Sequence, residues 1–216
     1  MTENELCELW LKYHVPTHIM AHMRRVEAVS MFVGEKINLL GGKVDLKILR
    51  QAALLHDLVK ICDFAELDLD GFDGFSAEDV QFWTALIRSC HKDGHITAVC
   101  NILEDLKEDR LAEIIKKHRF NCLIADDPAL RPESIEEKIL YYADKRVRHD
   151  QITSLAERLE DGRLRYFPDG NIPPEDALIE KALYKLESEI CRLAGIAPGE
   201  ISETTVAQTK IIQPAL

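Results

Sequence analysis

Apolar residues recur every three or four positions along most of the chain, which is the spacing of one face of an α-helix. Alternating runs of β-branched residues, which would predict strands, are hard to find. The pattern therefore predicts an all-α fold, a compact bundle of several helices. We expect helices near residues 3–13, 17–40, 45–62, 77–90, 95–106, 108–119, 134–150, 153–161 and 175–194.

Several predicted helix ends coincide with residues that cap or start helices. Pro16 precedes the second helix, and Asp45 can cap the third. Ser134 and Glu137 have the spacing of a capping box at the start of a later helix. Between the third and fourth helices, residues 63–76 form an acidic loop that contains glycine. This loop is either a solvated surface loop or a mobile lid.

The length of 216 residues is enough to bury a sizeable core, and it suits one main domain with appendages. We expect the main domain at residues 1–162. Residues 163–216 then hold a connector over 163–174, a C-terminal helix that packs on the domain, and a loosely packed tail over 195–216.

The formal net charge of −11 gives little attraction to polyanions. It argues against a nucleic acid polymer or a membrane as the partner, although a local basic pocket remains compatible with it. The first 30 residues lack the apolar centre of a signal peptide, and no run of 18 apolar residues is present. We therefore expect a cytoplasmic protein. The oligomeric state is left open.

The six cysteines are widely spaced and form no CxxC pair. We expect them to be reduced residues of the core. They are Cys7, Cys62, Cys90, Cys100, Cys122 and Cys191.

The stretch AALLHDLVK, residues 52–60, places His56 and Asp57 side by side within an apolar helix. Burial without partners costs roughly 2 to 7 kcal/mol for a neutral polar group and far more for a charge. A bound cation, a salt bridge or a water network would each compensate these two side chains.

Polar residues with metal-binding chemistry also lie on the predicted inward faces of four other helices. A lone buried histidine is more often a hydrogen-bonded core residue, so the interpretation depends on several residues together. Neutral imidazoles and carboxylates are ligands that zinc, manganese and iron share. Six such groups are enough for two ions about 3.5 to 4 Å apart, if Asp57, Asp144 or a hydroxide bridges them. The other residues are His22, His95, His118 and Asp144, with His91 as a competitor for the role of His95.

The segments HMRRV (22–26), LLHDLVK (54–60) and YYADK (141–145) resemble the H…HD…D signature of the HD-domain metal-dependent phosphohydrolases. This superfamily is all-helical, and the resemblance covers roughly residues 17–150. It implies that metal is bound by four residues, which are His22, His56, Asp57 and Asp144.

The fuller order H…HD…H…H…D is similar to HD proteins with a binuclear centre, including the bacterial group that splits dinucleoside tetraphosphates. In that resemblance, His95 and His118 complete the second metal site. The chain lacks the acidic pair that follows HD in guanosine tetraphosphate hydrolases and the GYP motif of cyclic di-GMP phosphodiesterases. Those two activities are therefore not expected.

Basic residues near these motifs are candidates for contact with a substrate phosphate. Lys60 lies one turn after His56, and in the family a lysine at this place is associated with the phosphate or with nearby acidic groups. The alternative is a solvated lysine attracted to the helix end. We expect Asp57 and Lys60 to be catalytic. The candidates for substrate binding are Arg25, Lys145, Arg146 and Arg148.

Together these features predict a metal-dependent phosphohydrolase that cleaves a phosphate ester or anhydride of a small metabolite, with a nucleotide as the favoured substrate. The cofactor is expected to be one or two divalent ions of Fe, Mn, Zn, Co or Ni, and Mg is also compatible. The alternative is a regulatory HD domain that senses a nucleotide without turnover. The complete set of ligands favours the enzyme.

Overall fold

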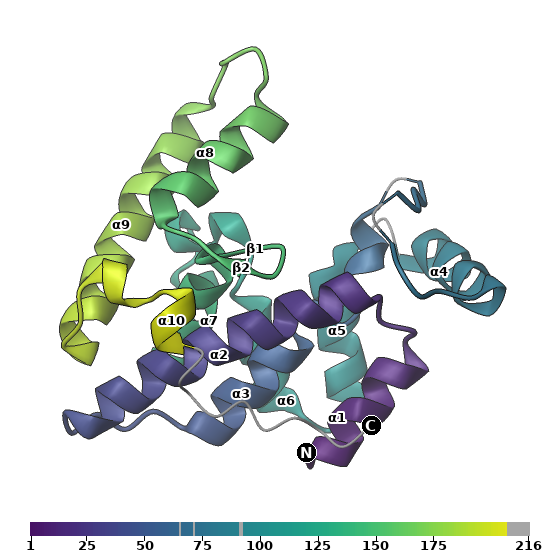
Figure 1. The fold of residues 1–216 in the computed structure, drawn as a ribbon, viewed down its shortest axis with the longest axis horizontal. Coiled ribbons are helices and arrows are strands. Elements are labelled where there is room, and N and C mark those ends of the chain that lie inside the picture. The colour runs from purple at the N-terminus through teal and green to yellow at the C-terminus, as the bar shows by residue number, and fades with distance from the viewer. Residues whose placement is uncertain (65, 71, 91–92, 207–216) are drawn as a thin grey trace.

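The computed structural model describes residues 1–64, 66–70, 72–90 and 93–206. Helices dominate its regular structure, which confirms the predicted all-α class (Figure 1). In the described ranges no helix is both long and apolar enough to cross a bilayer. The α-helices are α1 Glu3–Lys12, α2 Thr17–Leu39, α3 Leu46–Leu55, α4 Ala77–Cys90, α5 Gly94–Asp105, α6 Asp109–Lys116, α7 Ile135–Lys145, α8 Leu155–Tyr166, α9 Pro174–Ala194 and α10 Glu203–Val206.

Short elements connect these helices. A two-residue hairpin follows α7, in which Val147 pairs with Ile152. The short elements are the 3-10 helices η1 Lys60–Asp63, η2 Phe120–Ile124, η3 Pro128–Leu130 and η4 Pro198–Glu200, with the strands β1 Val147–Arg148 and β2 Gln151–Ile152.

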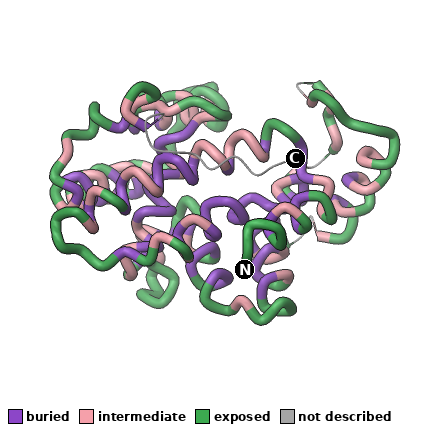
Figure 2. Tube along the Cα trace, turned by 60° about the horizontal axis from the view of Figure 1, so that its bottom comes forward, coloured by how far each residue is buried: buried purple, intermediate pink, exposed green. Residues whose placement is uncertain are grey.

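The long helix α2 lies in the core, where it packs against α3, α7 and α9. Val26 and Val29 of α2, Leu49 of α3 and Leu140 of α7 have no exposed surface. Burial of one such side chain stabilises the fold by about 1.5 to 3 kcal/mol. Figure 2 shows buried positions along the inner segments of the chain and exposed positions mainly at the periphery. The helices that carry most of the predicted ligands therefore contribute to the core.

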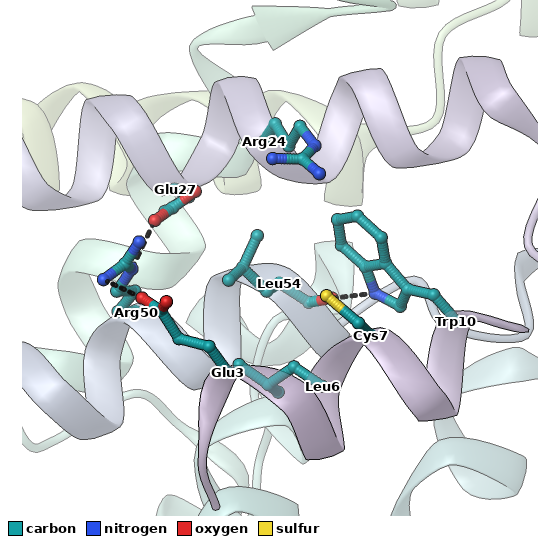
Figure 3. A pocket seen from close by; sticks show the side chains of 8 residues that line it. All are labelled: Glu3, Leu6, Cys7, Trp10, Arg24, Glu27, Arg50 and Leu54. Carbon is teal, nitrogen blue, oxygen red and sulfur yellow. Dashed lines mark hydrogen bonds and ion pairs between the residues drawn. The ribbon is translucent and has the colours of Figure 1, made fainter. Parts of the chain in front are cut away.

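Helix α1 is attached to α2 and α3 by polar contacts around a small pocket (Figure 3). Trp10 donates from its indole nitrogen to the carbonyl oxygen of Leu54, at 2.8 Å. Arg50 pairs with Glu27 of α2 at 2.5 Å and with Glu3 of α1 at 2.9 Å. These contacts fix the N-terminal helix against the side of the bundle.

The third helix is shorter than the predicted range 45–62, because α3 ends at Leu55. Asp45 caps its start, as predicted, by accepting from two backbone amides. At its end, the Nδ1 atom of His56 donates to the carbonyl oxygen of Ala53, an acceptor that a continuing helix would use for a backbone bond. After α3 the backbone hydrogen bonds join residues three apart instead of four, and the chain continues into the 3-10 helix η1. His56 and Asp57 therefore lie in a turn.

The predicted helix over 134–150 also ends early, at Lys145. The capping box of Ser134 and Glu137 at its start is confirmed. After α7 the chain turns through the β1–β2 hairpin, with His149 in the left-handed region at φ 56°. A non-glycine residue in this region marks a tight turn, and here the turn brings the His149 carbonyl group toward α2.

The C-terminal part is more ordered than predicted. Helix α8 runs to Tyr166, across the expected domain limit at residue 162 and into the expected connector. Arg163 of α8 pairs with Glu180 of α9, so these helices lie side by side (Figure 1). Residues 195–206 were expected to be a loose tail, but Ile201 and Val206 are buried against the domain. Apolar burial explains this correction, and residues 207–216 lie outside the described residues.

Cys62 and Cys90 form a disulfide, with their Cα atoms 5.5 Å apart. This separation is typical of disulfides. The expectation of reduced cysteines is therefore wrong for this pair, because the fold joins two cysteines that are 28 residues apart in the sequence. The free cysteines are Cys7, Cys100, Cys122 and Cys191.

We predict a pH-dependent contribution of Asp79 to stability. Hydrogen bonds from Ser76 and His14 lower the pKa of the Asp79 carboxyl from 3.8 to about 2. A carboxyl with a lowered folded-state pKa stabilises the fold above pH 3.8, and this contribution is lost as the pH falls toward 2. Asp79→Asn should therefore reduce the melting temperature at pH 6, and the difference from the parent should shrink by pH 2.5.

Thermal unfolding followed by circular dichroism measures both melting temperatures. Asp73→Asn is the control, because it removes an acidic side chain from the adjacent loop, where the described structure gives it no ion pair. A difference between the parent and Asp79→Asn that stays constant from pH 6 to pH 2.5 would contradict the assignment.

Candidate metal centre

The fold brings all six predicted ligands into one buried cluster. His22 lies within α2, His56 and Asp57 follow α3, His95 begins α5, His118 follows α6, and Asp144 lies near the end of α7. They form two groups of three, and within each group the ligand atoms lie within 4.8 Å of one another. The first group is His22, His56 and Asp144, and the second is Asp57, His95 and His118.

Asp57 faces both groups. Its Oδ1 atom lies 3.0 Å from Nε2 of His95 and 3.8 Å from Nε2 of His118. Its Oδ2 atom lies 3.9 Å from Nε2 of His22 and 3.7 Å from Nε2 of His56. The sequence left open whether Asp57, Asp144 or a hydroxide would bridge two ions. The Asp57 carboxylate fits this role, because it faces both ligand groups.

Asp144 faces the first group. Its Oδ1 atom lies 3.1 Å from Nε2 of His22 and 3.6 Å from Nε2 of His56. On its other side, Lys145 forms an ion pair with Oδ2. This arrangement fits a carboxylate that binds one ion and is held in place by a neighbouring cation.

All four histidines turn the same ring nitrogen toward the centre. The Nδ1 atom of each donates to an oxygen, which leaves the lone pair of Nε2 directed inward. Three of these acceptors are backbone carbonyls, of His149, Ala53 and Ile115, and the fourth is the Asp63 carboxylate. The distances are 2.8 Å for His22, 2.8 Å for His56, 2.6 Å for His118 and 2.6 Å for His95.

Two buried atoms in this cluster have no hydrogen-bond partner, Nε2 of His56 and Oδ1 of Asp57. An unsatisfied buried polar atom costs about 1 to 3 kcal/mol. In addition, Nε2 of His95 lies 3.4 Å from Nε2 of His118, so two ring nitrogens face each other. Divalent cations between these atoms would compensate all of them, and imidazole with carboxylate is a donor set that transition metals accept. The residues therefore fit metal ions.

The charges of Asp57, Asp144 and His118 are also those of metal ligands. Burial alone raises the pKa of the Asp57 carboxyl, but Lys60 and the imidazoles hold it well below its usual range. Burial likewise opposes ionisation of Asp144, and Lys145 with His22 and His56 keeps its pKa low. Burial lowers the pKa of His118 to about 4. Ionised carboxylates and a neutral imidazole are the forms that bind metal.

A cavity of about 1220 Å³ opens beside the cluster. Its lining includes side chains of both ligand groups, and the aromatic residues Phe64, Phe72, Phe120 and Tyr166 also border it. His18 lies edge-on to Phe72, with ring centres 4.5 Å apart. The candidate metal centre is therefore accessible to a small molecule from one side.

Lys60 and Lys145 are the two predicted basic residues that line this cavity. The Nζ atom of Lys60 lies 3.6 Å from Oδ1 of Asp57 and 3.5 Å from Nε2 of His95, so its ammonium group reaches the ligands. Lys145 Nζ pairs with Asp144 and lies 5.0 Å from the centre of the Tyr141 ring.

The three predicted arginines are not among the residues that line the cavity. Arg146 is buried and donates to the carbonyl oxygens of Thr153 and Ile201, which joins α7 to the C-terminal segment. Arg25 pairs with Glu203 at 2.8 Å, and Arg148 lies 3.9 Å from Asp161. The contact of Arg25, Arg146 and Arg148 with substrate phosphate therefore stays a prediction, and in this structure the three side chains pair with other groups. His91 lies outside the described residues.

Asp63 and Arg119 line the cavity but are not among the residues predicted from the sequence. Asp63 lies in a segment expected to be an acidic loop, and its contact with His95 requires the turn of η1. Arg119 directly follows His118, which was the one available signal for it.

The sequence model of the HD domain family matches residues 19–148, which is more than half of the chain and includes all six candidate ligands. The protein therefore belongs to the HD domain family. This family defines a superfamily of metal-dependent phosphohydrolases with an all-α fold. No curated protein and no solved structure gives a significant match to the chain.

We predict that the two ligand groups differ in their response to mutation. Asp57→Ala should abolish metal retention and turnover together, because its carboxylate faces both groups. His118→Ala should lose the second ion and keep the first, because His118 belongs to one group only. Elemental analysis after dialysis against Mn²⁺ or Zn²⁺ measures the ions bound per chain.

Asp68→Ala is the control for these substitutions, because Asp68 lies on the loop after η1 and, among the described residues, accepts only from the Asp70 amide. Two ions retained by Asp57→Ala would show that its carboxylate holds neither.

Proposed function

We propose that the protein is a metal-dependent phosphohydrolase that cleaves a phosphate ester or anhydride of a small metabolite, with a nucleotide as the favoured substrate. The observation that carries this proposal is the pair of ligand groups joined by Asp57, at the side of a cavity of about 1220 Å³. A centre of this kind with open access fits catalysis, because a purely structural metal site is closed by its ligands.

The cavity supports a nucleotide-sized substrate. Ligand pockets for small molecules typically measure about 300 to 1000 Å³, so this one has room for a base, a sugar and phosphates. Phe64 and Phe72 provide aromatic surface on which a base can pack. Lys60 and Arg119 provide positive charge near the ligands, where a phosphate would lie. The substrate phosphate therefore points to the cluster and the base to the aromatic residues.

The residues divide into two sets in this proposal. His22, His56 and Asp144 would hold one divalent ion, and Asp57, His95 and His118 would hold the other. Bound divalent ions in such a pair polarise a phosphoryl oxygen and lower the pKa of water.

The remaining chemistry is that of the protein's own groups. Water attacks phosphorus and gives up a proton, the bond from phosphorus to the leaving oxygen breaks, and the leaving oxygen takes up a proton. The Lys60 ammonium offsets negative charge that develops on the phosphoryl oxygens. The ionised carboxylates of Asp57 and Asp144 keep the ligand cluster from carrying excess positive charge. Because the cluster is buried, bulk water reaches it only through the cavity.

Release of phosphate from a panel of nucleotides, measured with Mn²⁺, Fe²⁺, Co²⁺, Ni²⁺ and Mg²⁺ in turn, tests the proposed function. We expect release by the parent protein and none by Asp57→Ala. Tight binding of a nucleotide without release under any of these ions would instead support a regulatory domain that senses nucleotides. Mononucleotides and dinucleoside polyphosphates belong in the same panel, because the cavity volume admits both kinds of phosphate chain.

We predict that Lys60→Ala lowers kcat and leaves metal content near that of the parent. Its ammonium group lies beside Asp57 but is not a metal ligand, so its main effect is on charge in the transition state. Loss of one such contact costs about 2 to 4 kcal/mol, roughly 30 to 1000-fold in rate. Steady-state kinetics together with elemental analysis measures both quantities.

Lys138→Ala is the matched control, because Lys138 also forms an ion pair, with Glu189 at 2.8 Å, but does not line the cavity. An unchanged kcat in Lys60→Ala would show that its ammonium group does not stabilise the transition state.

A further inference from the structure

His95 differs from the other three histidines in what holds its ring. The Nδ1 atoms of His22, His56 and His118 donate to backbone carbonyls, whereas Nδ1 of His95 donates to the carboxylate of Asp63, at 2.6 Å. The backbone amide of His95 also donates to Asp63, at 2.9 Å. One side chain therefore fixes both the ring and the start of α5.

A carboxylate in this position changes the ligand as well as its orientation. Hydrogen bonding of the distal ring nitrogen to an anion makes the other nitrogen a stronger donor to a cation. The Asp63 carboxylate lies 3.4 Å from Nζ of Lys60, so it also contacts the basic group beside the cluster. Its influence falls on the second ligand group, which contains His95.

The position of Asp63 depends on a short and partly exposed segment. Asp63 is the last residue of the four-residue helix η1, and its side chain is 36% exposed. The preceding residue, Cys62, is fully buried and is bonded to Cys90 at the end of α4. His95 follows only five residues after Cys90. The disulfide thus joins the two chain segments that meet at the contact between Asp63 and His95.

We propose that Asp63 is a positioning residue that strengthens metal binding by His95, and that the Cys62–Cys90 disulfide holds Asp63 in this position. This inference rests on the proposed metal centre. Reduction of the disulfide loosens η1 from α4 and weakens the second metal position, while the first position, formed by His22, His56 and Asp144, keeps its affinity.

The redox step requires a dithiol as reductant. A thiolate of the dithiol attacks one sulfur of the disulfide, which breaks the S–S bond and forms a mixed disulfide. The second thiol of the dithiol then attacks this mixed disulfide and releases the remaining cysteine as a thiol. Two electrons and two protons pass to Cys62 and Cys90, which become thiols, and the dithiol becomes a cyclic disulfide. No further reactant is consumed.

Metal titration of Asp63 variants tests the first part of the proposal. Asp63→Asn keeps a hydrogen-bond acceptor but loses the charge, and Asp63→Ala loses both. We expect the second Co²⁺ to bind about 10 to 100-fold more weakly to Asp63→Ala, with a smaller loss in Asp63→Asn, and the first Co²⁺ to bind as in the parent. The visible absorption of Co²⁺ follows each site independently of activity.

Asp68→Asn is the matched control and should bind both ions like the parent, since in the described structure the Asp68 side chain accepts from the Asp70 amide and from none of the ligand histidines. Parent-like binding of both ions by Asp63→Ala and Asp63→Asn would overturn the positioning role. Failure of the parent itself to bind Co²⁺ would overturn the metal centre, and the two failures are therefore distinguishable.

Reduction of the parent protein tests the second part. The protein is reduced with dithiothreitol, freed of it by gel filtration under inert gas, and titrated with Co²⁺. We expect weaker binding of the second ion after reduction and recovery after reoxidation. Equal binding in the oxidised and reduced protein would overturn the role of the disulfide.

The double variant Cys62→Ala, Cys90→Ala should bind the second ion like the reduced parent, and dithiothreitol should have no further effect on it. Circular dichroism checks that this variant is folded. If it does not fold, the reversible reduction of the parent decides the question, because no substitution is involved. A folded variant with parent-like binding of the second ion would count against the proposal.

Discussion

The structure depends on how six polar side chains are tolerated in an apolar core. Asp57 is central to this, because its two oxygens face different groups of imidazole nitrogens and its buried Oδ1 atom has no hydrogen-bond partner. Burial of such a group is costly unless opposite charge compensates it. The surrounding helices are arranged so that every imidazole directs a lone pair to the same small volume, which is the arrangement expected around cations.

Backbone carbonyl groups near helix ends orient three of the histidines. The turn after α3 exposes the Ala53 carbonyl to His56, the turn after α6 does the same for Ile115 and His118, and the hairpin after α7 brings the His149 carbonyl to His22. Carbonyl groups near helix ends lack helical partners and are free to accept from side chains. The irregular backbone at these points therefore sets the orientation of His22, His56 and His118.

The second ligand group is built differently from the first. Its histidine His95 relies on the carboxylate of Asp63, in a segment that is tied down by a covalent bond and not by deep burial. A ligand held by a partly exposed side chain is easier to disturb than one held by buried backbone. This difference is the basis of the proposed inequality between the two metal positions.

Periodicity and motif order in the sequence were enough to predict the all-α class, the main helices and the cluster of His22, His56, Asp57, His95, His118 and Asp144, which lie together as expected. The helices follow from local spacing, because residues three or four apart share a helix face. The grouping of the six ligands was implied by the resemblance of their order to the HD-domain signature. Other features depend on contacts between distant segments. The disulfide of Cys62, the contact of Asp63 with His95 and the inward packing of Arg146 against the C-terminal segment each join residues that are far apart in the sequence. Helix spacing carries no information about which segments meet, so only the tertiary structure decided these contacts.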